Sequence, residues 1–173
     1  IRDRERMLLD EKGGASDCGE AVVRTPAMME AYYERPDLTR EVLQDGWLRT
    51  GDVFARDEQG LYYFKARVKD VIKTGGENVY ASEVQAVILS HPEVQDCVVK
   101  GVPDLVWGEA VAAIVQPMKG SALSPKAIQD FCKRHLASYK KPQKIGLVDD
   151  LGRDESGKVG ADRMNELFSL AES

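Results

Sequence analysis

The sequence predicts an α+β protein: a β-rich subdomain, followed by a small α/β domain with a mixed sheet and about three helices. Two observations support this. Short apolar runs interrupted by turn residues dominate residues 1–66, whereas apolar runs of strand length alternate with helical patterns over residues 67–173. The boundary lies near residues 66–70 and lacks a linker rich in Pro or Gly, so we expect a short hinge between the two domains.

The first segment is mostly strand with little helix. Residues 19–26 form an apolar run that ends at a Pro, which predicts a short strand. Residues 37–46 have the pattern of a short helix that ends at Gly46. Residues 57–67 begin with a turn and continue with aromatic residues, which favours another strand.

The second segment alternates between strands and helices. Ser82 and Ser124 are the predicted N-caps of two amphipathic helices, and Pro125 fits the first helical position of the second one. Strands are predicted over 68–76, 94–104, 108–117 and 144–150, and a last helix over 161–171. This alternation favours a compact domain over residues 67–173.

Composition excludes several classes of protein. The formal net charge is -5 and the sequence shows no basic stripe, which argues against a nucleic-acid partner. No apolar run approaches the roughly 20 residues of a membrane-spanning helix. The cysteines Cys18, Cys97 and Cys132 have spacings that fit neither a zinc site nor a disulfide framework, which favours a reducing cytoplasm. Cys97 and Cys132 lie in apolar patterns and are expected to be buried.

Three stretches carry a family pattern. They are GWLRTGDV at residues 46–53, RVKDVIKTGGENV at 67–79 and ESGKV at 155–159. In this order and spacing they resemble the adenylate-forming enzymes, which include acyl-CoA synthetases, peptide-synthetase adenylation domains and beetle luciferases. The segments GGENV and WGEAV are most similar to those of AMP-forming acyl-CoA ligases.

The resemblance implies a part of a longer enzyme. Residues 1–66 would be the C-terminal, β-rich end of the large domain, and residues 67–173 the small mobile C-terminal domain. The family's phosphate loop has no counterpart in this sequence, so we expect the fragment alone to be inactive. The parent enzyme would use ATP with Mg²⁺ to convert a carboxylic acid to an acyl-adenylate, and would then transfer the acyl group to coenzyme A. The metal ligands would lie in the missing domain.

Asp52 and Arg67 are the implied nucleotide-binding residues. An ionised carboxylate such as that of Asp52 can accept from both vicinal hydroxyls of a ribose. The guanidinium of Arg67 presents a fork of donors to oxygens. The alternatives are a turn residue for Asp52 and a solvated strand-end cation for Arg67.

Lys158 is the implied catalytic residue. It follows a Ser-Gly turn, where a long side chain can extend from a loop. Its ammonium could lie between the substrate carboxylate and the α-phosphate of ATP and reduce their repulsion. The alternative is an ordinary surface lysine. The sequence departs from the family where Gly152 replaces the usual Pro, and a flexible glycine could loosen the approach to the loop.

The remaining implied residues concern domain rotation and thioester formation. Lys69 occupies the hinge position, where a few backbone dihedrals can swing a domain. Gly75 and Gly76 could permit close approach of a ligand to the backbone. The alternative is that they form a plain hairpin turn. The residues implied for the coenzyme A tunnel are Lys73, Gly75, Gly76, Trp107 and Gly108.

Two other functions remain open at this stage. The enzyme could serve the thiol of a carrier protein, or the chain could be a non-catalytic module that binds a nucleotide or a partner. His91 and His135 lack a nucleophilic partner at a motif spacing and are interpreted as structural or solvated, and no cluster of metal ligands is evident. Neither the acid nor the oligomeric state follows from these residues.

Overall fold

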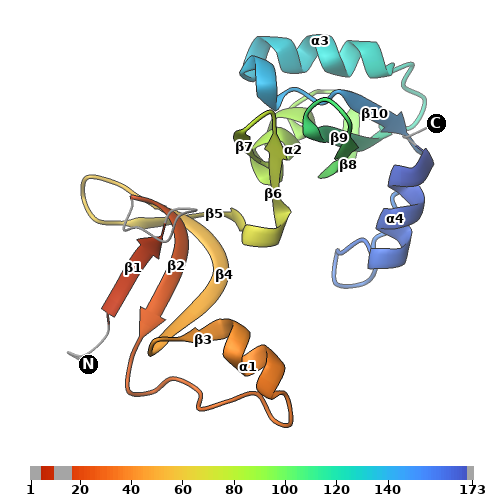
Figure 1. Cartoon of the computed structure of the whole chain (residues 1–173). Helices are drawn as coiled ribbons and strands as arrows, with labels where there is room; N and C mark the ends of the chain where they lie inside the picture. Colours follow the sequence, from red (N-terminus) through yellow and green to blue (C-terminus); the bar gives the residue numbers. More distant parts are fainter. Residues whose placement is uncertain (1–4, 10–16, 171–173) are drawn as a thin grey trace. The chain divides into compact units, whose positions relative to one another are not determined.

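The computed structural model describes residues 5–9 and 17–170 (Figure 1). Contacts divide the chain into two compact units, Ile1–Lys69 and Asp70–Ser173, which we call unit 1 and unit 2. The sequence predicts the boundary slightly earlier, between residues 66 and 67. The strand β5 (Tyr62–Arg67) and the 3-10 turn η1 (Val68–Asp70) run through this region.

Unit 1 is an antiparallel sheet with one short helix. The sheet has the order β1-β2-β4-β3, and β5 also pairs with β4. Its elements are β1 (Glu5–Leu9), β2 (Cys18–Arg24), α1 (Pro36–Val42), β3 (Leu43–Gln44) and β4 (Trp47–Arg56). The expected pattern of strands with little helix is confirmed.

The end of α1 corrects the helix predicted over 37–46. The helix stops at Val42 because Leu43 and Gln44 pair with the start of β4 instead. Asp45 and Gly46 then form the turn with positive φ values of 51° and 79°. Such φ values favour glycine, and a two-residue turn of this kind joins antiparallel strands.

Unit 2 is a mixed sheet covered by helices, as predicted. The sheet has the order β10-β9-β6-β7, with β8 also paired to β9. Strand β10 is parallel to β9, and the other pairings are antiparallel. The elements are β6 (Val71–Thr74), β7 (Glu77–Tyr80), α2 (Ala81–Leu89), β8 (Val94–Asp104), β9 (Gly108–Pro117), α3 (Pro125–His135), η2 (Ser138–Lys140), β10 (Lys144–Leu147) and α4 (Ala161–Leu170).

One of the two predicted N-caps is correct. Ser124 caps α3, because its side chain accepts a hydrogen bond from the Ala127 N–H at 3.2 Å, and Pro125 is the first helical residue. The prediction for Ser82 is wrong. Helix α2 starts directly after β7, so Tyr80 is the N-cap and Ser82 lies within the first turn.

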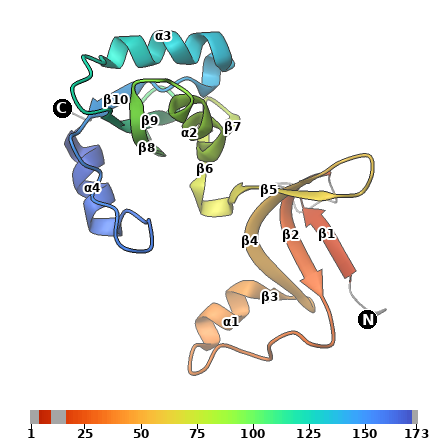
Figure 2. The same cartoon turned by 180° about the vertical axis from the view of Figure 1, so that it is seen from behind.

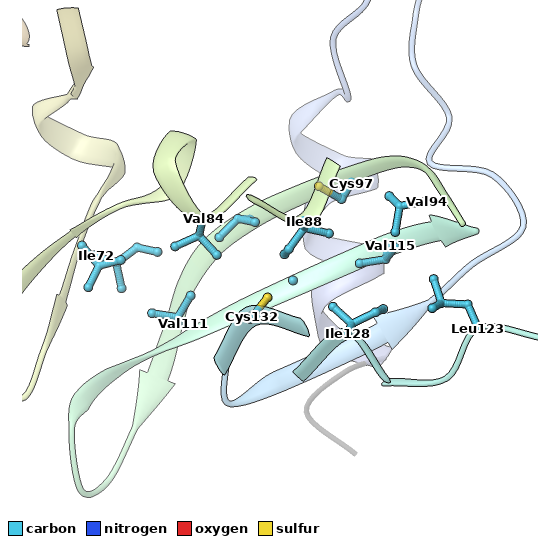
Figure 3. Packing of buried hydrophobic residues seen from close by; sticks show 13 residues of the cluster. Ile72, Val84, Ile88, Val94, Cys97, Val111, Val115, Leu123, Ile128 and Cys132 are labelled. Carbon is cyan, nitrogen blue, oxygen red and sulfur yellow. The ribbon is translucent and has the colours of Figure 1, made fainter. Parts of the chain in front are cut away.

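The core of unit 2 lies on both faces of its sheet. Alternate residues of β9 point to opposite sides, so that Val111 and Val115 join one apolar cluster and Ala112 and Ile114 join the other. The first cluster packs against α2 and α3 (Figure 3), and the second includes Leu167 and other residues of α4. In Figure 2, α3 and α4 accordingly lie on different sides of this sheet.

Cys97 and Cys132 belong to the first cluster, which confirms their predicted burial. Both thiols are free. Burial raises the pKa of the Cys97 thiol to about 12, because the charged thiolate loses its hydration. These residues therefore act as small apolar side chains, not as nucleophiles.

Candidate active site

A bulge in β4 determines the position of Asp52. Residues 49–53 of β4 run opposite residues 20–22 of β2 with a shift in register. Gly51 has a φ of +71°, and its N–H donates to the Glu20 carboxylate at 3.1 Å. The same buried carboxylate also pairs with Arg49. The buried Glu20 carboxylate thus stabilises the bulge through its bonds to Gly51 and Arg49. Asp52 is the residue directly after Gly51.

Asp52 and Arg67 lie opposite one another on β4 and β5. The Arg67 Nε atom is 2.9 Å from the Asp52 Oδ1 atom, and the side chains are 57% and 28% exposed, respectively. Oδ1 itself accepts no hydrogen bond within the described part of the chain. The two side chains therefore form an ion pair in which Asp52 Oδ1 is buried, while the exposed Arg67 guanidinium keeps donor capacity for a ligand. The sheet brings together the two residues that are implied for nucleotide binding.

Lys69 lies in the η1 turn, at the last position of unit 1. Its side chain is exposed. A short turn between two compact units is a suitable place for a hinge, because a few dihedral angles there can rotate a whole unit. The hinge function of Lys69 stays a prediction.

The β6–β7 turn packs against Trp107. The Gly75 N–H donates to the Trp107 carbonyl at 2.9 Å, and a Cβ atom on Gly75 would lie 2.7 Å from a carbon of the indole ring. Gly75 and Gly76 have φ values of 58° and 84°, whereas a Cβ on Gly76 would meet nothing within 4 Å. The two glycines therefore differ: the first admits the indole, and the second leaves the surface open.

The β8–β9 turn completes this cluster. The Asp104 carboxylate accepts hydrogen bonds from the N–H groups of Val106 and Trp107 at 2.9 and 3.1 Å, and these bonds lower the pKa of Asp104. Gly108 pairs with Thr74 of β6. We call Lys73, Gly75, Gly76, Trp107 and Gly108 the turn cluster. The five residues predicted for the thioester step thus meet at two neighbouring turns.

Glu109 holds Lys73 to this cluster. Its carboxylate accepts a hydrogen bond from the Lys73 N–H at 2.6 Å. A Cβ atom on Gly101 of β8 would meet the same carboxylate at about 3.0 Å, so a small residue is needed opposite it. Sequence reasoning did not identify Glu109, although it directly follows the turn in WGEAV.

A cavity of about 510 Å³ adjoins the turn cluster within unit 2. Trp107 and Tyr139 supply aromatic surface to it, and Lys133 and Lys141 supply cationic groups, of which Lys133 is paired with Asp130 at 2.8 Å. Lys140 anchors the adjacent η2 turn, because its Nζ lies within 2.8 Å of both carboxylate oxygens of Glu83. Of these lining residues, sequence reasoning identified Trp107 but not Lys133, Tyr139 or Lys141. The available signal was the basic run before Pro142, which resembles an ordinary solvated surface.

Lys158 projects from a tight loop built around Asp154. The Asp154 Oδ1 atom accepts from the Ser156 N–H, the Ser156 hydroxyl and the Lys158 N–H at 2.9, 2.7 and 3.0 Å. The Ser156 hydroxyl is the main cause of the lowered pKa of Asp154. Lys158 is exposed, and its Nζ atom has no ion-pair partner among the described residues. The loop thus has a defined backbone and presents an ammonium that a ligand can reach.

Gly152 does not simply replace a proline. Its φ is +72°, which the proline ring cannot adopt, and its N–H donates to the Asp150 carboxylate at 2.9 Å, which proline cannot do. The side chain of Arg163 lies 3.3 Å from the position of a Cβ atom on this residue. The approach to the loop therefore has its own backbone conformation at Gly152, held by a hydrogen bond.

The two histidines take part in packing. His91 and His135 lie on either side of Phe131, with ring centroids 4.8 and 4.4 Å from its centroid. This arrangement supports their interpretation as structural residues. Over residues 5–9 and 17–170 there is no group of His, Cys, Asp and Glu that could hold a metal ion. No helix in the described part of the chain is sufficiently long and apolar to cross a membrane.

Comparison with known proteins defines the class. Residues 83–158 match the family described as AMP-binding enzyme C-terminal domain, and this match ends at Lys158. Together with the relatives below, it shows that the chain belongs to the adenylate-forming enzymes and contains their C-terminal domain. The resemblance inferred from the sequence motifs is confirmed.

The relatives are mainly CoA ligases. The chain is 38% identical over 167 residues to 2-succinylbenzoate–CoA ligase of Geobacillus kaustophilus, covering 96% of this chain and 34% of the relative. It is 41% identical over 150 residues to fatty acid–acyl-carrier-protein ligase ScoC of Streptomyces coeruleorubidus, covering 87% and 29%. The crystal structure of ATP-bound MatB from Rhodopseudomonas palustris superposes with a TM-score of 0.84 and 32% identity, covering 95% and 34%. The chain thus spans about a third of the length of these relatives.

Proposed function

We propose that this chain is the C-terminal portion of an AMP-forming acyl-CoA ligase. The parent enzyme would activate a carboxylic acid with ATP to an acyl-adenylate and then transfer the acyl group to coenzyme A. The observation that carries the proposal is Lys158, which lies on a structured loop at the end of the family match and has no ion-pair partner among the described residues. The fragment alone would be inactive. Its free cysteines support a cytoplasmic location.

In the adenylation step, Asp52 and Arg67 would bind the ribose. The Asp52 carboxylate would accept from the two hydroxyls, and the exposed Arg67 guanidinium would donate to ligand oxygens. Lys158 would approach the substrate carboxylate and the α-phosphate, where it would offset the repulsion between two anions and stabilise charge in the transition state. Mg²⁺ would be carried by the phosphates of ATP.

In the thioester step, the turn cluster would border the path of coenzyme A. Gly76 leaves open space on the turn, so a pantetheine arm could pass close to the backbone there. The adjacent cavity places Lys133 and Lys141 near the aromatic surfaces of Trp107 and Tyr139. Such a set suits a ligand with phosphates and an adenine ring. A change of dihedral angles at Lys69 would rotate the small domain, so that Lys158 acts in the adenylation step and the turn cluster acts in the thioester step.

The test is the substitution Lys158→Ala in the full-length protein. We expect ATP–pyrophosphate exchange to slow by a factor on the order of 10² to 10³, because one preorganised cation is lost from the transition state. Thioester formation from preformed acyl-adenylate should be largely retained. Lys119→Ala is the matched control, since it removes another exposed lysine from a turn. If adenylation survives in Lys158→Ala, the catalytic role of Lys158 is wrong.

A second candidate is an enzyme that serves a carrier-protein thiol. The similarity to ScoC, whose name states an acyl-carrier-protein acceptor, favours this alternative. An assay of AMP release separates the two acceptors. The full-length protein is given the acid and ATP together with either coenzyme A or a phosphopantetheinylated carrier. A rate that rises only with the carrier would replace the coenzyme A proposal.

A further inference from the structure

Arg153 connects the Lys158 loop to the sheet of unit 2. On one side, its Nε and Nη2 atoms donate to the Asp96 Oδ2 and Oδ1 atoms at 2.5 and 2.8 Å. Asp96 belongs to β8, and its Oδ1 atom also accepts from the Cys97 N–H at 2.7 Å. The paired bonds from one planar guanidinium fix both the distance and the orientation of the two groups.

The same guanidinium also holds the loop itself. Its Nη1 atom donates to the carbonyl of Gly157, the residue before Lys158, at 2.7 Å. The backbone of Arg153 forms an isolated antiparallel bridge with Val159 on the other side of the loop. Arg153 therefore contacts β8 and both ends of the segment that carries Lys158. Its side chain is 33% exposed, so the link is only partly screened by solvent.

The hydrogen bonds within the loop itself do not connect it to β8. The three bonds to Asp154 lie within residues 154–158 and define the shape of the loop, but not its place on the sheet. Before the loop, the Gly152 N–H donates to Asp150 outside the sheet, whereas the Leu151 N–H donates to the Gln116 Oε1 atom of β9 at 3.1 Å and attaches the chain to that strand two residues before Arg153. Val159 is partly buried against the second apolar cluster and adds a non-directional contact. The directional anchor between the loop and β8 is thus the Arg153 side chain, mainly through its pair with Asp96 and also through a longer bond to the Cys97 carbonyl at 3.4 Å.

We propose that Arg153 and Asp96 are positioning residues that determine where the Lys158 ammonium is presented. The proposal rests on the function of Lys158 proposed above. We call the contacts of Arg153 with Asp96 and with the Gly157 carbonyl the clamp. Without the clamp, the loop would keep its internal turn but move relative to the sheet. A catalytic group that is displaced by about 1 Å can lose up to about 10² in rate, so its position is as important as its charge.

The first test measures amide hydrogen exchange in the Lys158 loop of the 173-residue chain. In Arg153→Ala, hydrogen exchange of the Lys158 and Gly157 amides should become faster by a factor on the order of 10, while exchange in β9 stays unchanged. Arg153→Lys should give an intermediate rate, because an ammonium can pair with Asp96 but cannot also hold Gly157. The control Glu166→Gln removes the partner of Arg163 within α4 and should leave the loop unchanged. Equal loop exchange in all variants would overturn the clamp.

The second test measures chemistry in the full-length protein. Arg153→Ala and the milder Asp96→Asn should each lower kcat for adenylation about tenfold, with little change in KM for ATP. Transfer from preformed acyl-adenylate should stay normal, and a melting temperature for each variant reports on folding. An equal loss in both steps, or no loss in adenylation, would overturn the positioning role. Should Lys158→Ala itself leave adenylation unchanged, the proposed function fails, and the exchange data alone then decide whether the clamp exists.

Discussion

Unit 1 and unit 2 hold their candidate residues by different structural means. In unit 1, Asp52 and Arg67 are register partners on paired strands. In unit 2, Gly75, Gly76, Trp107 and Lys158 lie on turns, and Lys73 and Gly108 lie at the strand ends next to these turns. Strand pairing fixes a residue through the sheet ladder, whereas a turn depends on its own hydrogen bonds and glycines. The positions in unit 2 are therefore more sensitive to single changes near them.

The two units also differ in how much apolar core supports their sheets. Unit 2 has apolar clusters on both faces of its sheet. In unit 1 the fully described buried apolar residues are few: Leu8, Val22, Val53 and Ala66. A cavity of about 280 Å³ borders Leu8 and Val22 there. The well-packed sheet of unit 2 can thus support functional turns, while unit 1 depends more on its strand ladder.

The largest expected effect tests this difference in packing. Val111→Ala in unit 2 should lower the free energy of unfolding by about 2 to 3 kcal/mol, because it leaves a void among close-packed neighbours. Val22→Ala in unit 1 removes the same atoms beside an existing cavity and should cost only about 1 kcal/mol. Denaturant unfolding measures both values.

The two tryptophans make this experiment specific. Trp47 lies in unit 1 and Trp107 in unit 2, and the sequence contains only 2 tryptophans. In a Trp47→Phe background, fluorescence reports unfolding of unit 2, and in a Trp107→Phe background it reports unfolding of unit 1. Equal losses of stability for the two Val→Ala variants would contradict the proposed difference between the cores.

The strand-held pair should show the next largest effect. Asp52→Asn keeps the size of the side chain but loses the charge and one acceptor site, so the Kd for AMP in the full-length protein should rise about tenfold, or ~1.4 kcal/mol. Because the ladder holds the position, stability should hardly change. Asp57→Asn, in the next turn of unit 1, is the control. Unchanged affinity in Asp52→Asn would refute the ribose contact.

The two turn glycines should respond differently, although both have positive φ. Gly75→Ala and Gly76→Ala should each cost about 1 kcal/mol in stability from backbone strain alone. Only Gly75→Ala should also displace the Trp107 ring and change its fluorescence, because the new Cβ would overlap it. A bulky residue at Gly76 should spare adenylation and block thioester formation in the full-length protein. Equal damage to both steps would contradict the assignment of Gly76 to the tunnel.

The strand and helix pattern was largely predictable from the sequence, but the supports of the site were not. The apolar run in 108–117 has the length of a strand, and this local feature predicted β9 correctly. The Arg153–Asp96 pair joins residues that are distant in the chain, so no local spacing reveals it. The end of α1 and the N-cap of α2 were mispredicted because strand pairing overrode local helix signals at both places.

The smallest expected effect is the pH dependence of the Lys158 loop. Hydrogen bonds, chiefly from the Ser156 hydroxyl, lower the pKa of Asp154 in the folded state. The loop stabilisation is thus fully present above the ordinary Asp pKa of about 4 and is lost only as the pH falls through the lower folded value. The amide chemical shift of Lys158 should therefore stay constant from pH 7 to about 4 and change below that pH. In Ser156→Ala the midpoint should rise, and a midpoint that does not move would show that Ser156 does not support this carboxylate.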